Sequence, residues 1–340
     1  MLAKINLPCQ LLNACACTYD IVDNTKTYNP ESLYADTIGW GLGPGAPTVI
    51  TGQNEKYYDA ALVGIVQNLH VNNTVAPGIV IAFQGTISVT TPGGLKDWMT
   101  DFDATPVPFI EGKTGDLVHK GIYDSVKSIL SQILQALSTL QNANNSLPIF
   151  VTGHSKGGGM APIAAAILIN KYKYVIQEVY TFAAPMIGNA SFGANFPLNK
   201  PVQRFENYID IIPFLMPNDT FISTLRTAAN NATPIHKVEM DLFIDFLLTV
   251  RNKFSATGYV PLGNLNFINE NRTITVTSFP PNTPNPSAID LASKLASGLP
   301  GFVIVGNAHS HACGSKVTTN GINYFMGYMG GVANHMGLCK

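Results

Sequence analysis

The sequence predicts an α/β fold in which a mostly parallel central sheet is flanked by helices. Between residues 79 and 208, short apolar runs rich in β-branched residues alternate with longer segments whose apolar residues recur at helical spacing. This alternation of strands and helices is typical of a parallel sheet covered by helices. With 340 residues, of which 46% are hydrophobic and 12% charged, the chain can bury a core large enough for such a sheet.

The individual elements follow from these local patterns. Residues 79–83 form a continuous apolar run after Pro77-Gly78, which predicts a strand buried on both faces. Residues 121–140 carry apolar side chains at intervals of three and four, which predicts an amphipathic helix. Further along the chain, the same patterns predict a strand at 147–152, a helix at 156–171 and two strands at 178–184 and 202–208.

Beyond Asp219 the patterns are looser. The remaining elements expected are a helix at 240–250, a hairpin formed by 259–267 and 273–277, a loop at 279–286 and a short helix at 288–296. The sequence contains no internal repeat and no low-complexity linker. It therefore predicts one domain over residues 1–340 with an enlarged C-terminal region.

Charge and hydropathy exclude two classes of partner. The formal net charge is −1, so there is no electrostatic basis for binding nucleic acid. No apolar run reaches the ~18–20 residues of a membrane-spanning helix, so no transmembrane segment is expected.

Residues 1–12 hold one lysine and a short apolar stretch broken by Pro8 and Gln10, a poor match to a signal peptide. Either the protein is cytoplasmic or a leader has been removed.

One motif between a predicted strand and a predicted helix indicates a catalytic function. Gly153-His154-Ser155-Lys156-Gly157 is a G-x-S-x-G sequence, and it lies where the strand at 147–152 meets the helix at 156–171. Such a turn exposes its serine at the carboxyl edge of the sheet, and the helix that follows directs N–H groups toward a developing oxyanion. Ser155 is therefore the predicted nucleophile; the alternative is a Gly/Ser turn without chemistry.

The motif belongs to a longer ordered series that resembles the class 3 lipases, a family that includes fungal triacylglycerol lipases and related feruloyl esterases and phospholipases. The resemblance extends over about residues 79 to 217. In chain order the matching segments are 81–86, 97–98, 118–121, 153–158, 180–185, 188–189 and 207–213. Agreement in this order is more specific than any single motif. It implies an α/β-hydrolase fold and a carboxylic ester hydrolase.

Two positions depart from the family pattern. Gln84 stands where the family usually has arginine, which alters a structural ion pair. Lys156 follows the nucleophile where the family often has leucine, which replaces an apolar wall with a cation near the acyl site.

In α/β-hydrolases the acid and the base follow the nucleophile in that order along the chain. Asp210 follows the strand at 202–208 and corresponds to the family's acid; the alternative is a turn carboxylate. The base is then a histidine beyond Asp210, and the candidates are His236, His309, His311 and His335. His309 is preferred and His311 is the second choice, because a small-residue loop directly after an apolar run is where this fold holds its base. His236 precedes the predicted hairpin and His335 lies in the last six residues.

The resemblance also implies an oxyanion hole and a lid. The oxyanion donors correspond to Thr86 and to the backbone N–H of Lys156. The segment at about 87–104 corresponds to the family's lid, and Leu95, Trp98, Met99 and Phe102 recur on one apolar helical face. An ordinary surface helix gives the same stripe.

The reaction expected from these residues needs no cofactor and no metal. Five cysteines at irregular spacing provide neither a complete disulfide framework nor a zinc-binding pattern. The expected substrate is a lipid or other ester at a lipid–water interface, and the expected activity is that of a triacylglycerol lipase or esterase. Phospholipase A1, feruloyl or aryl esterase, and a non-catalytic α/β-hydrolase-fold binding protein are the alternatives. Family resemblance implies secretion, and the oligomeric state is left open.

Overall fold

A computed structural model describes residues 6–22, 26–30, 33–53, 58–86, 103–143, 147–256, 258–277, 286–297, 309, 316–319, 322–325 and 328. Its centre is an eight-stranded sheet in the order β1-β2-β3-β6-β7-β9-β11-β12. The bounds of these strands are β1 Thr48–Gln53, β2 Tyr58–Val71, β3 Thr74–Phe83, β6 Ile149–His154, β7 Ile176–Phe182, β9 Gln203–Asn207, β11 Asn264–Ile268 and β12 Ile274–Thr277.

Five neighbouring strands of this sheet are parallel. β3, β6, β7, β9 and β11 run in one direction, and β1, β2 and β12 add antiparallel edges. The mostly parallel sheet predicted from the sequence is confirmed. The carboxyl ends of β3, β6 and β9 lie at one edge, so the residues that follow these strands meet there.

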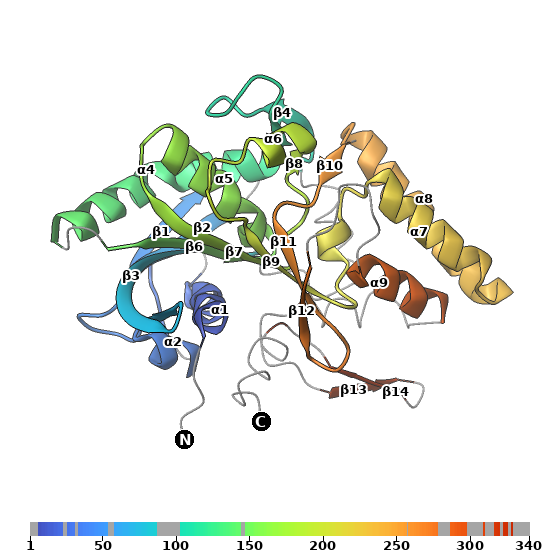
Figure 1. Cartoon of the computed structure of the whole chain (residues 1–340), viewed down its shortest axis with the longest axis horizontal. Helices are drawn as coiled ribbons and strands as arrows, with labels where there is room; N and C mark the ends of the chain where they lie inside the picture. The colour runs from blue at the N-terminus through green and yellow to red at the C-terminus, as the bar shows by residue number, and fades with distance from the viewer. Residues whose placement is uncertain are drawn as a thin grey trace.

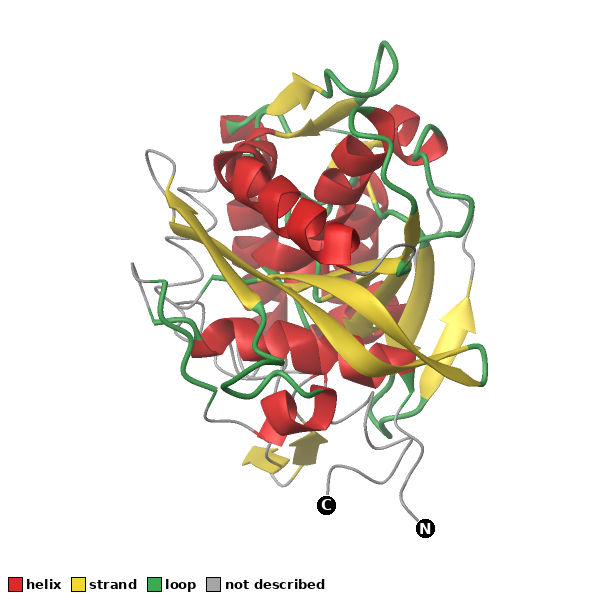
Figure 2. Cartoon of the chain, turned by 90° about the vertical axis from the view of Figure 1, so that its left-hand side faces the viewer, coloured by secondary structure: helices red, strands yellow, loops and turns green. Residues whose placement is uncertain are grey.

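Helices cover both faces of the sheet, as Figures 1 and 2 show. On one face lie α4 Lys120–Ala143 and α5 Lys156–Asn170, and on the other lie α1 Leu7–Cys17, η1 Thr18–Asp20 and α2 Leu33–Ile38. Each face has its own apolar core: one joins the sheet to α4 and α5, and the other joins it to α1, α2 and Trp40. α5 is buried almost all round, because it packs between the sheet and α4.

The N-terminal segment is part of this core. Asn6 caps α1 by accepting a hydrogen bond from the Cys9 N–H, and Pro8 occupies the first turn, where a missing N–H costs nothing. Cys9, Cys15 and Cys17 are free and buried, and burial raises the pKa of the Cys9 thiol to about 11 and of the other two to about 12.

After β9 the chain forms an additional helical layer. η2 Ile212–Phe214 leads to α7 Asp219–Asn230, α8 Pro234–Lys253 and, later, α9 Pro286–Ala296. Figure 1 shows α7 and α8 side by side at the end of the sheet remote from β1. Their apolar faces join the same core as α4 and α5. Among the residues that the structure describes, no helix combines the length and the hydropathy needed to cross a membrane.

The predicted hairpin is correct in its turn but wrong in its first arm. β11 and β12 pair around residues 269–273, whereas β10 Tyr259–Val260 joins a separate small sheet with β8 Gly188–Asn189, β5 Leu117–His119 and β4 Pro106–Pro108. Gly263 breaks the expected strand, because its φ of 83° suits glycine and a side chain there would collide with Val202. The remaining elements are α6 Ala190–Ala194, β13 Lys316–Thr319 and β14 Ile322–Phe325.

Candidate active site

The turn between β6 and α5 holds Ser155 in a strained conformation. Its φ is 59° and its ψ is −128°, a combination that non-glycine residues rarely adopt. The two flanking glycines make the turn possible: a side chain at Gly153 would collide with Gly157, and one at Gly157 would collide with Phe83 of the neighbouring strand. The Ser155 N–H donates to the Phe182 carbonyl at 2.9 Å, which fixes the turn to the end of β7.

Asp210 and His309 form a buried pair beside this turn. His309 Nδ1 lies 3.0 Å from Asp210 Oδ2 and 3.2 Å from Oδ1, although the two residues are 99 positions apart. Asp210 is completely buried, and the Ile212 N–H donates to its Oδ1 at 2.9 Å. A carboxylate that only accepts hydrogen bonds places the imidazole hydrogen on Nδ1 and leaves Nε2 able to accept a proton.

The Ser155 hydroxyl and the second imidazole nitrogen of His309 lack a hydrogen-bond partner among the described residues. Within the described part of the chain, Ser155 Oγ and His309 Nε2 are both buried without a hydrogen-bond partner. His154, the neighbour of Ser155 in the chain, has its ring centroid 4.7 Å from that of His309. Buried polar atoms in native proteins are almost always hydrogen bonded, so an unpartnered serine hydroxyl and an unpartnered imidazole nitrogen on neighbouring segments are candidates for a functional site.

His154 supports the His309 backbone. Its Nε2 donates to the His309 carbonyl at 2.6 Å, and its Nδ1 lies 2.8 Å from the Tyr19 hydroxyl. Because a carbonyl can only accept, Nε2 carries the hydrogen, and in the neutral ring Nδ1 accepts from Tyr19. Tyr19 lies in no sequence motif, so the sequence did not indicate this contact.

Tyr328 was also missed. Its hydroxyl donates to Asp210 Oδ2 at 2.6 Å and accepts from the Asn207 N–H at 3.0 Å. Burial raises the pKa of Tyr328 well above its ordinary value, with the Asp210 charge as the next cause, so the hydroxyl keeps its hydrogen. No local pattern marks this tyrosine, because its partners lie more than 100 residues away in the chain.

Gly85 brings the end of β3 close to Ser155. A Cβ atom at Gly85 would lie 2.9 Å from the Ser155 Cβ and 2.8 Å from the His154 carbonyl oxygen, so only glycine fits. Thr86 follows it, and its Oγ1 is buried without a hydrogen-bond partner among the described residues. Gln84, which precedes it, donates from Nε2 to the Thr18 carbonyl at 2.6 Å and so ties β3 to η1.

The ammonium of Lys156, which the sequence predicted near the acyl site, is paired with a buried carboxylate. Its Nζ lies 2.9 Å from Asp59 Oδ1 and donates to the Tyr58 carbonyl at 3.0 Å. Both side chains are almost fully buried, with 4% of Lys156 and 0% of Asp59 exposed. The ammonium therefore points to the start of β2, where Asp59 neutralises it, and Ser128 Oγ donates to the other carboxylate oxygen at 2.8 Å.

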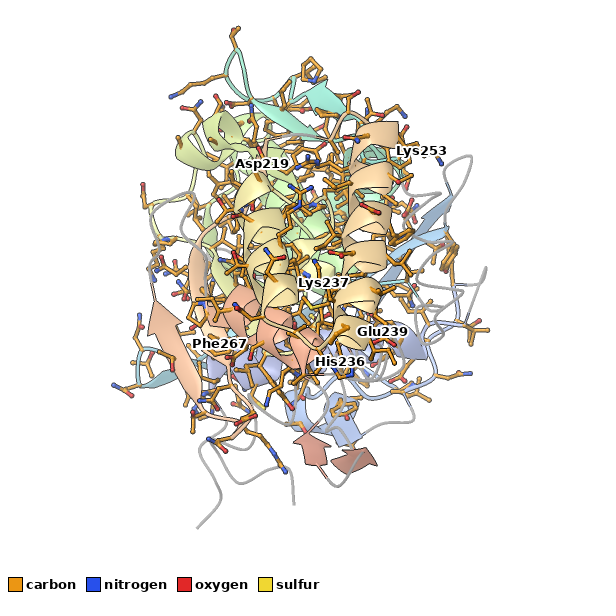
Figure 3. The ribbon with its side chains drawn as sticks, turned by 90° about the vertical axis from the view of Figure 1, so that its right-hand side faces the viewer. Asp219, His236, Lys237, Glu239, Lys253 and Phe267 are labelled. Atoms are coloured by element: carbon orange, nitrogen blue, oxygen red, sulfur yellow. The ribbon has the colours of Figure 1, made fainter. Side chains whose placement is uncertain are left out.

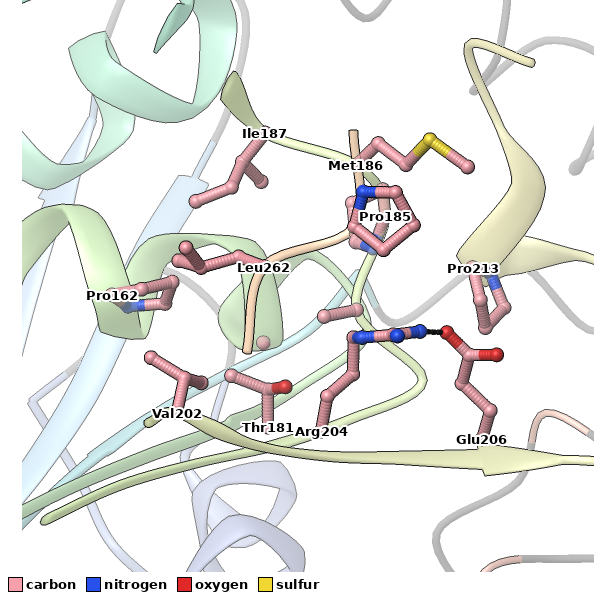
Figure 4. Close-up of a pocket in the computed structure, with 13 residues that line it drawn as sticks. Pro162, Thr181, Pro185, Met186, Ile187, Val202, Arg204, Glu206, Pro213 and Leu262 are labelled. Atoms are coloured by element: carbon pink, nitrogen blue, oxygen red, sulfur yellow. Dashed lines mark ion pairs between the residues drawn. The ribbon is translucent and has the colours of Figure 1, made fainter. Parts of the chain in front are cut away.

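A cavity of about 20 Å³ lies behind the elbow, between α5, the end of β7 and β9 (Figure 4). Arg204 and Glu206 form an ion pair in its wall, and burial lowers the pKa of Arg204 to about 10. A volume of this size holds about one water molecule, so this cavity is not an acyl groove.

Several predicted residues lie outside the described part of the chain. These are His311, His335 and the lid residues Leu95, Trp98, Met99 and Phe102. His236 lies in the first turn of α8. Among the described residues, no three His, Cys, Asp or Glu side chains gather in a way that could hold a metal ion.

The chain is similar to one known protein family and to several known lipases. Residues 80–220 match the family described as Lipase (class 3). The secreted mono- and diacylglycerol lipase 1 of Fusarium solani is 34% identical over 123 residues, which cover 35% of this chain and 32% of that protein. A lipase of Rhizomucor miehei is 29% identical over 144 residues, which cover 41% and 38%. The secreted mono- and diacylglycerol lipase A of Penicillium cyclopium is 30% identical over 209 residues, which cover 56% and 65%. The match thus spans about a third of the first two relatives.

Solved structures share the fold over most of the chain. The triacylglyceride lipase of Rhizomucor miehei has a TM-score of 0.57 at 18% identity, and the match covers 89% of this chain and 92% of that structure. Another fungal lipase has a TM-score of 0.53 at 18% identity, with 90% and 97% covered. The predicted α/β-hydrolase architecture, a mostly parallel sheet with flanking helices, is therefore confirmed.

Proposed function

We propose that this chain, which matches the class 3 lipase family over residues 80–220, is a serine hydrolase that cleaves carboxylic esters of lipids with Ser155 as its nucleophile. The observation that carries the proposal is the pair of buried, unpartnered atoms Ser155 Oγ and His309 Nε2, with Asp210 on the other nitrogen of the imidazole. A serine hydroxyl, an imidazole nitrogen that can accept its proton and a carboxylate on the other imidazole nitrogen are the groups that general-base activation of a serine uses.

In the proposed reaction, His309 accepts the Ser155 proton as Oγ attacks the ester carbonyl carbon. Asp210 orients the ring and stabilises the imidazolium that forms. The backbone N–H groups of Thr86 and Lys156 donate to the oxyanion of the tetrahedral intermediate. The alcohol leaves with the proton from His309, and a water molecule activated by the same ring then releases the acid from the acyl-enzyme.

The proposed substrates are acylglycerols. Relatives from Fusarium and Penicillium are named mono- and diacylglycerol lipases, and a plant relative is named a triacylglycerol lipase. Phospholipase A1 and feruloyl or aryl esterase activities use the same machinery and are the alternatives. Rates on p-nitrophenyl esters from acetate to palmitate, with an acylglycerol, a phospholipid and a feruloyl ester beside them, separate these substrate classes.

The decisive experiment combines chemical labelling with two variants. Ser155→Ala should abolish labelling by a fluorophosphonate probe, and both Ser155→Ala and Asp210→Asn should lower ester hydrolysis by ~10⁴ or more, because triad members act as a unit. Ser223→Ala, an exposed serine on α7, is the matched control and should keep full activity. A wild-type protein that neither reacts with the probe nor turns over any ester is the non-catalytic binding protein instead. Activity within tenfold of wild type in either variant contradicts the assignment.

We further propose a lid at residues 87–104, because Leu95, Trp98, Met99 and Phe102 recur at the spacing of one apolar helical face. Such a face covers the pocket when closed and lies on lipid when open. The rate of tributyrin hydrolysis should then rise sharply above the solubility limit of the substrate, and Trp98→Ala should weaken this rise. A smooth rate curve in wild type, together with an unchanged Trp98→Ala variant, contradicts the lid.

Secretion is also proposed, because relatives from Fusarium and Penicillium are named as secreted lipases. Ester hydrolase activity recovered with the cell fraction, and absent from the medium of the producing organism, would contradict it.

A further inference from the structure

One helix outside the family match leaves an apolar stripe uncovered. The match ends at residue 220, and α8 lies beyond it. Ile235, Val238 and Leu242 are 72%, 59% and 66% exposed. Their spacing of three and four residues places them on one side of the helix, opposite the side that packs on the core. The core side is formed by Met240, Ile244, Leu247 and Val250.

The stripe is confined to the first half of the helix. The same line of the helix continues through Asp245, Thr249 and Asn252, which are exposed and polar. Figure 3 shows this half of α8 beside α7, with the side chains of His236, Lys237 and Glu239 at its lower end. An apolar patch with a polar border on a well-packed helix is typical of a surface that binds something apolar.

The charges around the stripe are few, and acidic groups outnumber basic ones. Lys237 Nζ lies 3.1 Å from Asp241 Oδ2 and also donates to Asn230 Oδ1 at 3.3 Å. Glu239 is exposed beside them, and His236 lies in the same turn. There is no cluster of lysines or arginines on this part of α8 that would select an anionic surface. The partner favoured by this chemistry is therefore apolar and electrically neutral.

The area of the stripe favours a lipid surface over a second copy of the chain. Three aliphatic side chains exposed to this degree offer roughly 200–300 Å² of apolar surface. A stable dimer buries about 800 Å² on each partner, which is several times more. A lipid surface needs no matching patch, and a few aliphatic side chains on one helical face can enter its interfacial layer.

α8 is tied firmly to the segment that carries Asp210. Phe214 of η2 stacks on Phe221 of α7, with ring centroids 4.4 Å apart. Arg251 of α8 donates to the Pro217 carbonyl at 3.2 Å and pairs with Asp219 at 2.8 Å. The stripe therefore holds a fixed position relative to the carboxyl edge of the sheet.

We infer that Ile235, Val238 and Leu242 dock the chain on a neutral lipid surface, an inference that rests on the proposed hydrolysis of lipid esters. The docking contact is apolar, so binding should be insensitive to salt and should not require anionic lipid.

The test measures binding to vesicles of ether-linked phosphatidylcholine, a zwitterionic lipid without an ester to cleave. Replacing Ile235, Val238 and Leu242 together by serine should lower the partition coefficient at least tenfold. The matched control replaces Asp245, Thr249 and Asn252 by serine on the same line of the helix and should bind as wild type does. Hydrolysis of a soluble p-nitrophenyl ester should be unchanged in both, which also shows that both are folded.

A gain-of-binding variant gives a second test. Thr249→Leu extends the stripe along the same line and should raise the partition coefficient several-fold. Vesicle binding by the triple-serine variant equal to that of wild type overturns the inference. So does a wild-type dimer that the same three substitutions convert to a monomer, because a second copy then covers the stripe. Loss of vesicle binding in a protein that hydrolyses no ester leaves the docking surface standing and refutes the proposed function.

Discussion

Removing the buried charge next to the proposed nucleophile should destabilise the protein without removing the proposed oxyanion donor. Lys156→Met keeps the backbone N–H at this position and nearly the same side-chain length. It deletes the ammonium that lies 2.9 Å from Asp59 Oδ1. The carboxylate of Asp59 then stays buried with only hydrogen-bond donors such as Ser128 to stabilise it.

The size of the effect follows from the burial of both groups. With 4% and 0% of the two side chains exposed, water screens the pair very little. Breaking such a pair by deleting one partner costs about 3–5 kcal/mol, because an uncompensated charge remains inside. Replacing both partners removes that charge, so Lys156→Met with Asp59→Leu should be more stable than the sum of the single variants by ~2–3 kcal/mol.

The assay is urea unfolding of the wild type, the two single variants and the double variant at neutral pH, followed by tryptophan fluorescence. Initial rates on a soluble ester are measured well below the unfolding midpoint of each protein. We expect kcat/KM of Lys156→Met to stay within tenfold of wild type. A loss of stability below 1 kcal/mol in Lys156→Met, or additive single variants, would refute the reasoning from the buried pair.

Three further predictions concern the histidines and Tyr328. His309→Ala should abolish ester hydrolysis and His311→Ala should not; the opposite result would assign the base to His311. In the wild type, kcat/KM should fall on the acid side of its pH profile with one ionisation. Tyr328→Phe removes the hydroxyl that donates to Asp210. A hydrogen bond to a charged group contributes about 1.5 kcal/mol, so kcat should fall roughly tenfold. An unchanged kcat contradicts a positioning role for Tyr328. Burial lowers the pKa of His119 to about 3, below the 6.5 of an unperturbed histidine. As the pH falls, His119 is therefore protonated in the unfolded chain before it is protonated in the folded protein. The stability that the neutral ring contributes is present above pH 6.5 and is lost as the pH falls toward 3. At pH 5 the loss is about 2 kcal/mol. In His119→Gln the urea midpoint should fall less between pH 7 and pH 5, and an equal fall in both proteins contradicts the prediction.

The parallel part of the sheet could be predicted because its signals are local. Each buried strand is a short apolar run, and each helix between them repeats its apolar residues at helical spacing. The strand-to-helix turn around Ser155 needs glycines at fixed positions, so its sequence is distinctive. The position of Asp210 after β9 follows from the rule that residues at the carboxyl ends of parallel strands meet at one edge.

The antiparallel edge could not be predicted from the same signals. β2 is 14 residues long, but the polar residues Gln67, Asn68 and His70 interrupt its apolar pattern where its register with β3 shifts. α1 is short and apolar nearly all round, which resembles a weak targeting segment more than a helix of the core. Only Asn6 and Pro8, a cap and a first-turn proline, could have marked its start.

The supporting contacts of the site were missed for a different reason. Tyr19 reaches His154 across 135 positions of the chain, and Tyr328 reaches Asp210 across 118. Neither tyrosine lies in a motif, and hydrogen bonds between distant residues leave no periodic pattern in a single sequence. These residues become recognisable only when the sheet has brought the segments together.

The distribution of these contacts along the chain has a consequence for biosynthesis. Tyr19 leaves the ribosome roughly 300 residues before Tyr328, and translation at ~5–20 residues per second separates the two by roughly 15 to 60 s. During this interval the apolar surface of α1 stays exposed until β6 and β7, the strands it covers, have been synthesised. The carboxylate of Asp210 likewise lacks its partners until His309 and Tyr328 have been synthesised. Nascent chains stalled before residue 309 should therefore carry a folded elbow that cannot react with a fluorophosphonate. Reactivity should appear only when the segment that holds His309 and Tyr328 has left the ribosome.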